Sequence, residues 1–186
     1  IKPANMSYEE ATAVPIGATT AFLLLPKGHI LRGQTVLIYV PSGRVGSYSI
    51  LLARFFGALV SVVSISANLA IVISLGAGYV LDYTKEAFLS REERYDVIFD
   101  TVAKFPKSEA VKALAPNGTY VTMARLDSKE SMENLVFIKE LIEAGALKVV
   151  IDRCYPLEHM VEAHRYVDAG RKKGNVVIKV GHHHDK

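Results

Sequence analysis

Two glycines that follow an apolar run are the residues of this sequence best suited to hold a charged ligand. Residues 36–40 are apolar, Gly43 and Gly46 follow in a short turn, and an amphipathic segment comes next. A strand, a glycine turn and a helix in this order open dinucleotide-binding units. The free amide groups and partial positive charge of a helix N-terminus suit a pyrophosphate. Gly43 would let the backbone approach the phosphates, and Gly46 would let the helix pack close to the strand.

The same turn departs from the usual glycine pattern. Val40 stands where the first glycine of the fingerprint is expected, and Pro41, which has no N–H to donate, comes next. Both residues should stiffen the turn and weaken a phosphate cradle. A strand-to-helix turn that uses glycine only for packing is therefore an alternative interpretation of this segment.

Hydroxyl side chains mark the end of the next predicted strand, residues 59–63. NAD-binding proteins usually place Asp or Glu there, about 20 residues after the glycine turn, to bind the ribose hydroxyls. This sequence has Ser64 and Ser66 at that place and no carboxylate. Serine hydroxyls can donate to a 2′-phosphate and no negative charge would repel it, so the pattern favours NADP over NAD. An ordinary helix N-cap at Ser66 is the alternative, and the two roles are compatible.

Strands and helices alternate along the chain. A capping-box pattern, Ser7 with Glu10, opens the first helix. We expect further helices at residues 15–27, 44–55, 68–75, 107–114, 131–144 and 156–170, and a tight turn at 116–118. We expect strands at residues 36–40, 59–63, 79–81, 95–99, 119–123, 147–151 and 176–180. Because most strands are apolar on both faces, the pattern predicts an α/β fold, a Rossmann-type doubly wound parallel sheet with helices on both faces.

Composition excludes several classes of protein. The chain has 186 residues, of which 50% are hydrophobic and 22% charged, as expected for a globular domain with its own core and not for a disordered chain. The formal net charge of +3 is scattered, so we expect no nucleic-acid partner. The single Cys154 cannot form an internal disulfide or a four-cysteine zinc site and favours a cytoplasmic, reducing compartment. Residues 55–81 carry no charge, but glycines and serines interrupt them, so we expect no membrane span.

In its motifs, the chain resembles the cofactor-binding half of the medium-chain dehydrogenase/reductase superfamily. The nearest likeness is to the zinc-independent, quinone-oxidoreductase-like branch, whose members are often labelled zinc-type alcohol dehydrogenase-like. The motifs occur in order: Ser7–Ala11, Val14-Pro-Ile-Gly-Ala-Thr-Thr-Ala21, Gly33–Tyr39, Ser42-Gly-Arg-Val-Gly46, Tyr95–Thr101, Pro116-Asn-Gly118 and Leu141–Gly145. The resemblance implies an NADPH-dependent oxidoreductase that transfers hydride to a small quinone, enone or carbonyl.

The resemblance also implies positions for the cofactor, although it identifies no catalytic acid or base. It implies no catalytic zinc, because Ile16 stands where zinc-dependent members carry a cysteine. Ala67 stands where many NADP-using relatives have Arg or Lys, which should weaken 2′-phosphate binding. The implied cofactor-binding residues are Ser42, Gly43, Arg44 and Val45 at the pyrophosphate, Ser64, Ser66 and Tyr83 at the adenosine 2′-phosphate, and Thr20, Thr101, Val102 and Met123 at the nicotinamide.

The superfamily's N-terminal barrel-like domain, which normally supplies much of the substrate pocket, has no counterpart in this sequence. We expect residues 1–186 to form one Rossmann-type domain, with residues 1–28 and 155–186 packing toward that missing domain. The partners expected are a small-molecule substrate and, at most, a second copy in a homodimer, without nucleic acid or membrane. The rival interpretation is a non-catalytic association module that has lost nucleotide binding, which Val40 and Pro41 favour. The order of the motifs argues against a third alternative, a methyltransferase.

Overall fold

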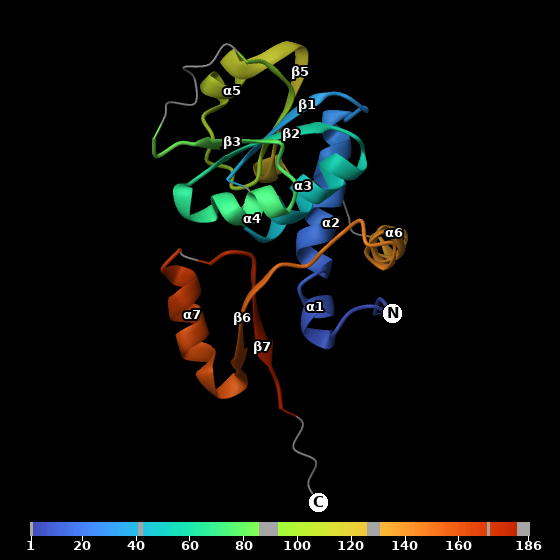
Figure 1. The fold of residues 1–186 in the computed structure, drawn as a ribbon, viewed down its shortest axis with the longest axis vertical. Helices are drawn as coiled ribbons and strands as arrows, with labels where there is room; N and C mark the ends of the chain where they lie inside the picture. The colour runs from blue at the N-terminus through green and yellow to red at the C-terminus, as the bar shows by residue number, and fades with distance from the viewer. Residues whose placement is uncertain (1, 41–42, 86–92, 126–130, 171, 182–186) are drawn as a thin grey trace, which may run out of the picture.

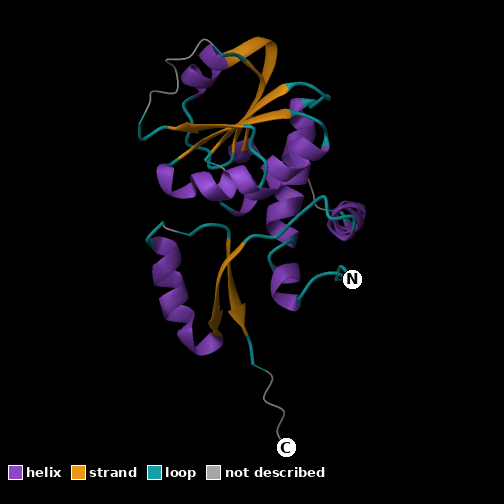
Figure 2. Ribbon diagram, in the orientation of Figure 1, coloured by secondary structure: helices purple, strands orange, loops and turns teal. Residues whose placement is uncertain are grey.

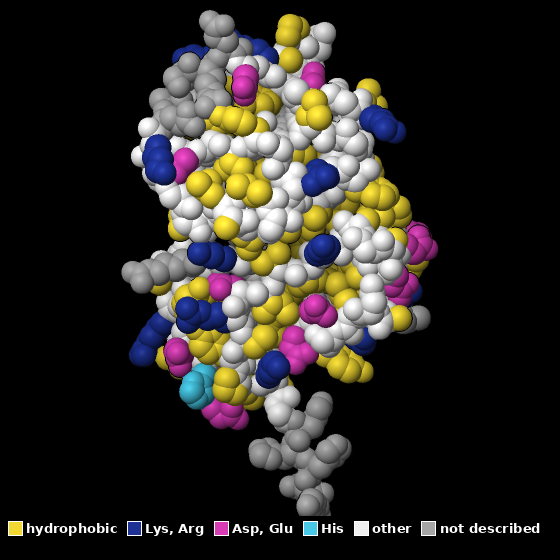
Figure 3. All heavy atoms as spheres, in the orientation of Figure 1, with side chains coloured by type: hydrophobic (Ala, Val, Ile, Leu, Met, Phe, Trp, Pro, Cys, Tyr) yellow, Lys and Arg dark blue, Asp and Glu magenta, His cyan; other side chains and the backbone are white. Residues whose placement is uncertain are grey.

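A computed structural model describes residues 2–40, 43–85, 93–125, 131–170 and 172–181. A five-stranded sheet with its helices forms the upper part in Figure 1, and a two-stranded sheet with one helix forms the lower part. Figure 2 shows the same arrangement by secondary structure. Hydrophobic, basic and acidic side chains are interspersed over the face seen in Figure 3, in agreement with the scattered charge of the sequence.

The five-stranded sheet is parallel throughout and has the strand order β3-β2-β1-β4-β5. Its winding reverses between β3 and β4, which places the topological switch point at β1 and β4. Open sheets of this kind bind ligands outside the carboxyl ends of the strands at that point. The predicted doubly wound parallel fold is therefore confirmed. The strands are β1 (Thr35–Tyr39), β2 (Leu59–Ser64), β3 (Tyr79–Asp82), β4 (Tyr95–Asp100) and β5 (Leu114–Thr122).

Both faces of this sheet are buried, as the apolar runs predict. Val36 and Ile38 of β1 pack in the larger core with helices α2, α3, α4 and α6, whereas Leu37 faces the smaller core with Ala110 of α5. The helices are α1 (Tyr8–Thr12), α2 (Pro15–Leu24), α3 (Arg44–Phe55), α4 (Leu69–Ser74), α5 (Lys107–Ala113), α6 (Met132–Glu143) and α7 (Met160–Asp168). Short 3₁₀ segments are η1 (Leu25–Gly28), η2 (Ser66–Asn68), η4 (Met123–Arg125) and η5 (Leu157–His159).

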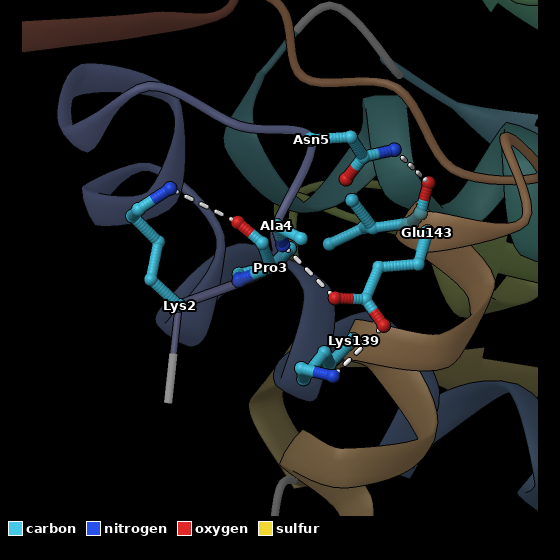
Figure 4. A network of polar contacts seen from close by, with 7 residues as sticks. Lys2, Pro3, Ala4, Asn5, Lys139 and Glu143 are labelled. Carbon is cyan, nitrogen blue, oxygen red and sulfur yellow. Dashed lines mark hydrogen bonds and ion pairs between the residues drawn. The ribbon is translucent and has the colours of Figure 1, made fainter.

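The N-terminal segment is fixed to the rest of the domain by polar contacts. The predicted capping box is present, with Ser7 and Glu10 bonding each other's backbone amides. Ala4 N donates to Glu143 Oε1 at 2.9 Å and Asn5 Nδ2 donates to Ile142 O at 3.0 Å, so the segment before α1 lies against the end of α6 (Figure 4). This contact joins the start of the described chain to the helix that follows β5.

Two local predictions are wrong. The strand predicted at residues 147–151 begins only at Ile151, because the amides of Ala146 and Leu147 donate to Leu141 O and close the end of α6. The predicted turn at 116–118 lies inside β5, where the pairing with β4 shifts register and Asn117 has a φ of 65°. An irregular strand takes the place of the turn there.

The two-stranded sheet is separate from the larger one. It consists of β6 (Ile151–Pro156) and β7 (Asn175–Lys179), parallel and joined through α7. Lys179 pairs with Glu9 of α1 at 2.7 Å, and this pairing lowers the pKa of Glu9 to about 2. One edge of this small unit is thereby attached to the N-terminal helix.

Among the described residues there is no helix with the length and apolar character needed to cross a bilayer. The uncharged stretch 55–81 instead holds β2, α4 and β3, as predicted.

Candidate cofactor site

The turn between β1 and α3 is held by hydrogen bonds from two neighbouring strands. Val40 has a φ of 53°, in the left-handed region that a β-branched residue rarely adopts. The hydroxyl of Thr101, after β4, lies 2.9 Å from both Tyr39 O and Val40 O and donates to them. Val40 N donates to Val63 O of β2 at 2.9 Å. The turn is therefore constrained, as Val40 predicts, and Pro41 and the candidate Ser42 lie outside the described residues.

The front of α3 offers room for an anion. Gly43 is the N-cap residue, so no side chain of its own satisfies the first amide groups of the helix. A Cβ built on Gly43 would meet no heavy atom of the described residues within 4 Å beyond its chain neighbours. Arg44 is exposed at the first position of the helix, and Val45 behind it is buried. The described residues thus leave space beside Gly43, and Arg44 adds a positive charge there.

A second cation lies near this helix end. Lys172 is partly buried, and its pKa is lowered, first by burial and then by the positive charge of Arg44. Its loop is anchored by Asp152, which accepts from Lys173 N and from the Tyr166 hydroxyl, both at 2.7 Å. Sequence reasoning missed Lys172, because a basic run after a helix is usually a solvated end. Only the tertiary fold brings it within range of Arg44.

At the end of β2 the structure leaves a buried hydroxyl unpaired. Ser64 is 1% exposed, and its Oγ has no hydrogen-bond partner among the described residues. Such an atom costs about 1–3 kcal/mol when unsatisfied, so buried hydroxyls normally have a partner. Ser64 lies at the carboxyl edge of the sheet, where a bound dinucleotide would place its adenosine ribose. Ser64 therefore has the position and the hydrogen-bond donor that the predicted cofactor would require.

A carboxylate stands beside Ser64, which corrects the expectation of an edge without negative charge. Asp82, at the end of β3, is in register with Ser64 of β2 and is 7% exposed. Its oxygens accept from the Ser66 hydroxyl, and from the Thr84 hydroxyl and amide at 2.5 and 3.0 Å. These bonds, that of Ser66 first, lower the pKa of Asp82, so it is ionised at neutral pH. Lys85 lies 3.8 Å away.

The hydroxyl of Ser66 is thus already committed. Ser66 is the first residue of η2 and donates its hydrogen to Asp82, so it caps no helix with its side chain and has no hydrogen left for a phosphate. The N-cap interpretation of Ser66 is wrong, because η2 has no side-chain cap hydrogen bond. A role as phosphate donor would require the Ser66 hydroxyl to turn away from Asp82.

Aromatic rings complete this edge. Tyr83 is 45% exposed, and its ring stacks on Tyr39 at a centroid distance of 6.5 Å. Tyr39 in turn stacks on Phe105 at 4.6 Å. Tyr83 therefore offers a partly open face next to Asp82, on the side where the sequence places it.

The residues predicted at the nicotinamide side are spread over α2 and the ends of β4 and β5. Thr20 is buried in α2, Met123 begins η4, and Val102 is partly exposed. The hydroxyl of Thr101 bonds to backbone carbonyls of the β1 turn, so its hydrogen points at the backbone and not toward the site. Buried Asp100 shapes the following loop by accepting from the amides of Val102 and Phe105, at 3.1 and 2.9 Å.

Asp100 also accepts from the Tyr120 hydroxyl at 3.0 Å. Burial and this bond raise the pKa of Tyr120 to about 12, so it stays a neutral donor. Through this bond β5 helps to fix the loop that ends β4.

For a metal ion the described residues provide no cluster of three or more His, Cys, Asp or Glu side chains. Ile16, at the position of the zinc-ligating cysteine, is 57% exposed on α2 and offers no ligand.

Known proteins are similar to this chain in sequence and in fold. Family models described as zinc-binding dehydrogenase match residues 45–147 and 125–178. The 2-methylene-furan-3-one reductase of Solanum lycopersicum is 35% identical over 190 residues, a match that covers 96% of this chain and 48% of the relative. The chloroplastic NADPH-dependent alkenal/one oxidoreductase of Arabidopsis thaliana is 30% identical, with 96% and 49% covered. The chain thus spans about half the length of these two relatives.

Solved structures agree with the fold. The crystal structure of an NAD-dependent alcohol dehydrogenase superposes with a TM-score of 0.82 at 27% identity. The match covers 97% of this chain and 61% of the dehydrogenase chain. The quinone oxidoreductase from Coxiella burnetii superposes with a TM-score of 0.81 at 23% identity, covering 97% and 63%, and supports the fold alone.

Proposed function

Because this chain belongs to the zinc-binding dehydrogenase family, as a cofactor-binding domain of the medium-chain dehydrogenase/reductase superfamily, we propose that it holds NADPH for an oxidoreductase. One observation supports this most: among the described residues, the front of α3 has free space at Gly43, and on the same sheet edge the buried hydroxyl of Ser64 has no hydrogen-bond partner. A packing turn alone would need neither feature.

In this proposal the two ends of the candidate cofactor site bind different parts of the cofactor. Backbone amides at Gly43, Arg44 and Val45 bind the diphosphate, and Arg44 and Lys172 balance its charge. At the other end, Ser64 donates a hydrogen bond to the ribose region while Lys85 and Tyr83 face the 2′-phosphate. The name of the Arabidopsis relative, an NADPH-dependent alkenal/one oxidoreductase, supports this choice of cofactor.

When bound, the reduced nicotinamide supplies the hydride. We propose a small conjugated acceptor, a quinone, enone or carbonyl, in line with the names of the reductase and alkenal/one relatives. In this proposal Thr20, Val102 and Met123 border the nicotinamide, and Thr101 fixes the β1 turn at the same sheet edge. The proposed reaction is independent of zinc.

The rest of the proposal concerns what surrounds this domain. The β6–β7 unit and residues 1–28 pack toward a separate catalytic domain, so the 186-residue chain alone binds cofactor weakly and is a poor catalyst. Its partners are a small-molecule substrate and, at most, a second copy, without nucleic acid or membrane. The exposed free thiol of Cys154 fits a reducing compartment such as the cytoplasm.

Titration of the chain with NADPH, followed by nicotinamide fluorescence, tests the proposal. We expect saturable binding that Gly43→Val abolishes, because a side chain there fills the open space while the fold tolerates it. Gly181→Val, at another open position, is the matched control and should bind normally. Absence of saturation at millimolar NADPH would instead support the association module.

A further inference from the structure

The carboxylate of Asp82 lies at the sheet edge where we expect the adenosine ribose, whose 2′ position distinguishes NADH from NADPH. Asp82 and Ser64 are register partners on β3 and β2, and the hydroxyl of Ser66 bridges from the chain after β2 to Asp82. The ribose of the adenosine is expected at this edge, and its 2′ position carries a hydroxyl in NADH and a phosphate in NADPH.

The hydrogen bonds of Asp82 leave room for one more donor. A carboxylate offers about four lone-pair positions, and the bonds from Ser66 and Thr84 use three. The side chain is 9% exposed, so it is reached from solvent at this edge. A ribose 2′-hydroxyl can donate into the remaining position, whereas a phosphate oxygen cannot.

Charge acts in the same direction. The ionised Asp82 repels a 2′-phosphate, and Ser66 cannot compensate because its hydrogen already points at Asp82. Ala67, which follows, adds no positive charge. Lys85 is a cation near this edge among the described residues: it lies 3.8 Å from the carboxylate, and its side chain is 69% exposed, so it can turn toward a phosphate.

We propose that Asp82 is a specificity-determining residue that takes the place of the acidic group missing from β2. It accepts the ribose 2′-hydroxyl of NADH and opposes the 2′-phosphate of NADPH, while Lys85 attracts that phosphate. The chain therefore accepts both dinucleotides with weak discrimination. This inference rests on the proposed cofactor function and adds the residue pair that sets cofactor choice.

The test compares the dissociation constants of NADPH and NADH for four forms of the full 186-residue chain, by nicotinamide fluorescence. In the unaltered chain we expect the two constants to agree within about tenfold. Asp82→Asn should shift their ratio toward NADPH by about tenfold, and Lys85→Gln should shift it toward NADH by about threefold, since each change alters one charge near the phosphate. Glu140→Gln, an exposed carboxylate on α6, is the matched control and should leave the ratio unchanged.

The outcomes separate the two proposals. If both dinucleotides bind and neither variant moves the ratio by more than about twofold, a shift too small for a neighbouring charge, the role of Asp82 is overturned and the cofactor function stands. If neither dinucleotide binds the unaltered chain, both proposals fall. Thermal melts report folding, and if Asp82→Asn does not fold, Lys85→Gln at its exposed position decides alone.

Discussion

The two ends of the candidate cofactor site are built on opposite principles. The front of α3 combines a glycine with free space around it among the described residues, a helix N-terminus without a side-chain cap there, and two cations, Arg44 and Lys172. The ends of β2 and β3 combine an unpaired hydroxyl at Ser64 with the ionised carboxylate of Asp82. In our proposal, the α3 end binds the diphosphate of either dinucleotide, and the β2–β3 end distinguishes the group at the ribose 2′ position.

This contrast assigns affinity and selectivity to different elements of one sheet edge. A diphosphate is common to both nicotinamide dinucleotides, so the α3 end cannot tell them apart. Changes at α3 should therefore alter both affinities together, whereas changes at the β2–β3 end should alter their ratio or the stability of the empty site. The predictions that follow test this division.

The largest expected effect comes from the α3 end. The double change Arg44→Gln and Lys172→Gln should weaken the binding of NADPH and NADH alike by at least about a hundredfold, because two charge-assisted bonds of about 1.5–3 kcal/mol each contribute about 3 kcal/mol or more. Fluorescence titration measures both constants. A matched double change on the opposite face, Lys107→Gln with Lys112→Gln on α5, should have little effect. If only one of the two dinucleotides lost affinity, the assignment of affinity to the α3 end and of selectivity to the β2–β3 end would be wrong.

Ser64→Ala should have two effects of opposite sign. Removing an unsatisfied buried hydroxyl should raise the free energy of unfolding of the empty protein by about 1 kcal/mol, while cofactor affinity falls by about fivefold for want of the donor. Urea unfolding and titration measure the two. If the variant is destabilised and binds normally, Ser64 has a structural partner and no ligand.

Val40→Gly tests the strain in the β1 turn. The left-handed conformation destabilises a residue with a side chain by about 1–2 kcal/mol. Glycine avoids this strain but loses more conformational entropy on folding, which offsets about 0.5–1 kcal/mol of the gain. The free energy of unfolding should therefore rise by about 0.5–1 kcal/mol, with the affinity for NADPH kept. A less stable variant in urea unfolding would show that the Val40 side chain contributes packing that outweighs its strain.

The smallest effect concerns pH. The pKa of Asp82 is lowered in the folded state, so the stability it contributes is fully present above its ordinary value of 3.8 and is lost as pH falls through the lowered pKa. The difference in melting temperature between the unaltered chain and Asp82→Asn should stay constant from about pH 8 to about pH 5 and shrink below about pH 4. A difference that changes near neutral pH would assign the effect to another group.

The sequence predicted the sheet because its signals are local. Apolar residues on both faces of successive strands, as in residues 36–39 and 95–99, require a covered parallel sheet. The glycine turn predicted the front of α3 for the same reason, since a strand, a glycine and a helix lie within one short segment. The prediction of a strand at 147–151 failed where the amides of Ala146 and Leu147 closed α6 instead.

The rest of the site depends on contacts between distant segments. Asp82 is separated from Ser64 along the chain, and only the β2–β3 register makes them neighbours. Lys172 is far from Arg44 along the chain, and only the tertiary fold brings it close enough for the charge of Arg44 to lower its pKa. No pattern of residue types within a single element carries such information, so the sequence analysis assigned neither the carboxylate of Asp82 nor the second cation, Lys172, to this sheet edge.

The central claim, that a dinucleotide's diphosphate binds at the front of α3, is tested most directly by NMR of the backbone amides during an NADPH titration. The account predicts that the signals of Gly43, Arg44 and Val45 shift progressively and saturate together with that of Ser64. Shifts that leave these four residues unchanged, or that never saturate, would contradict it.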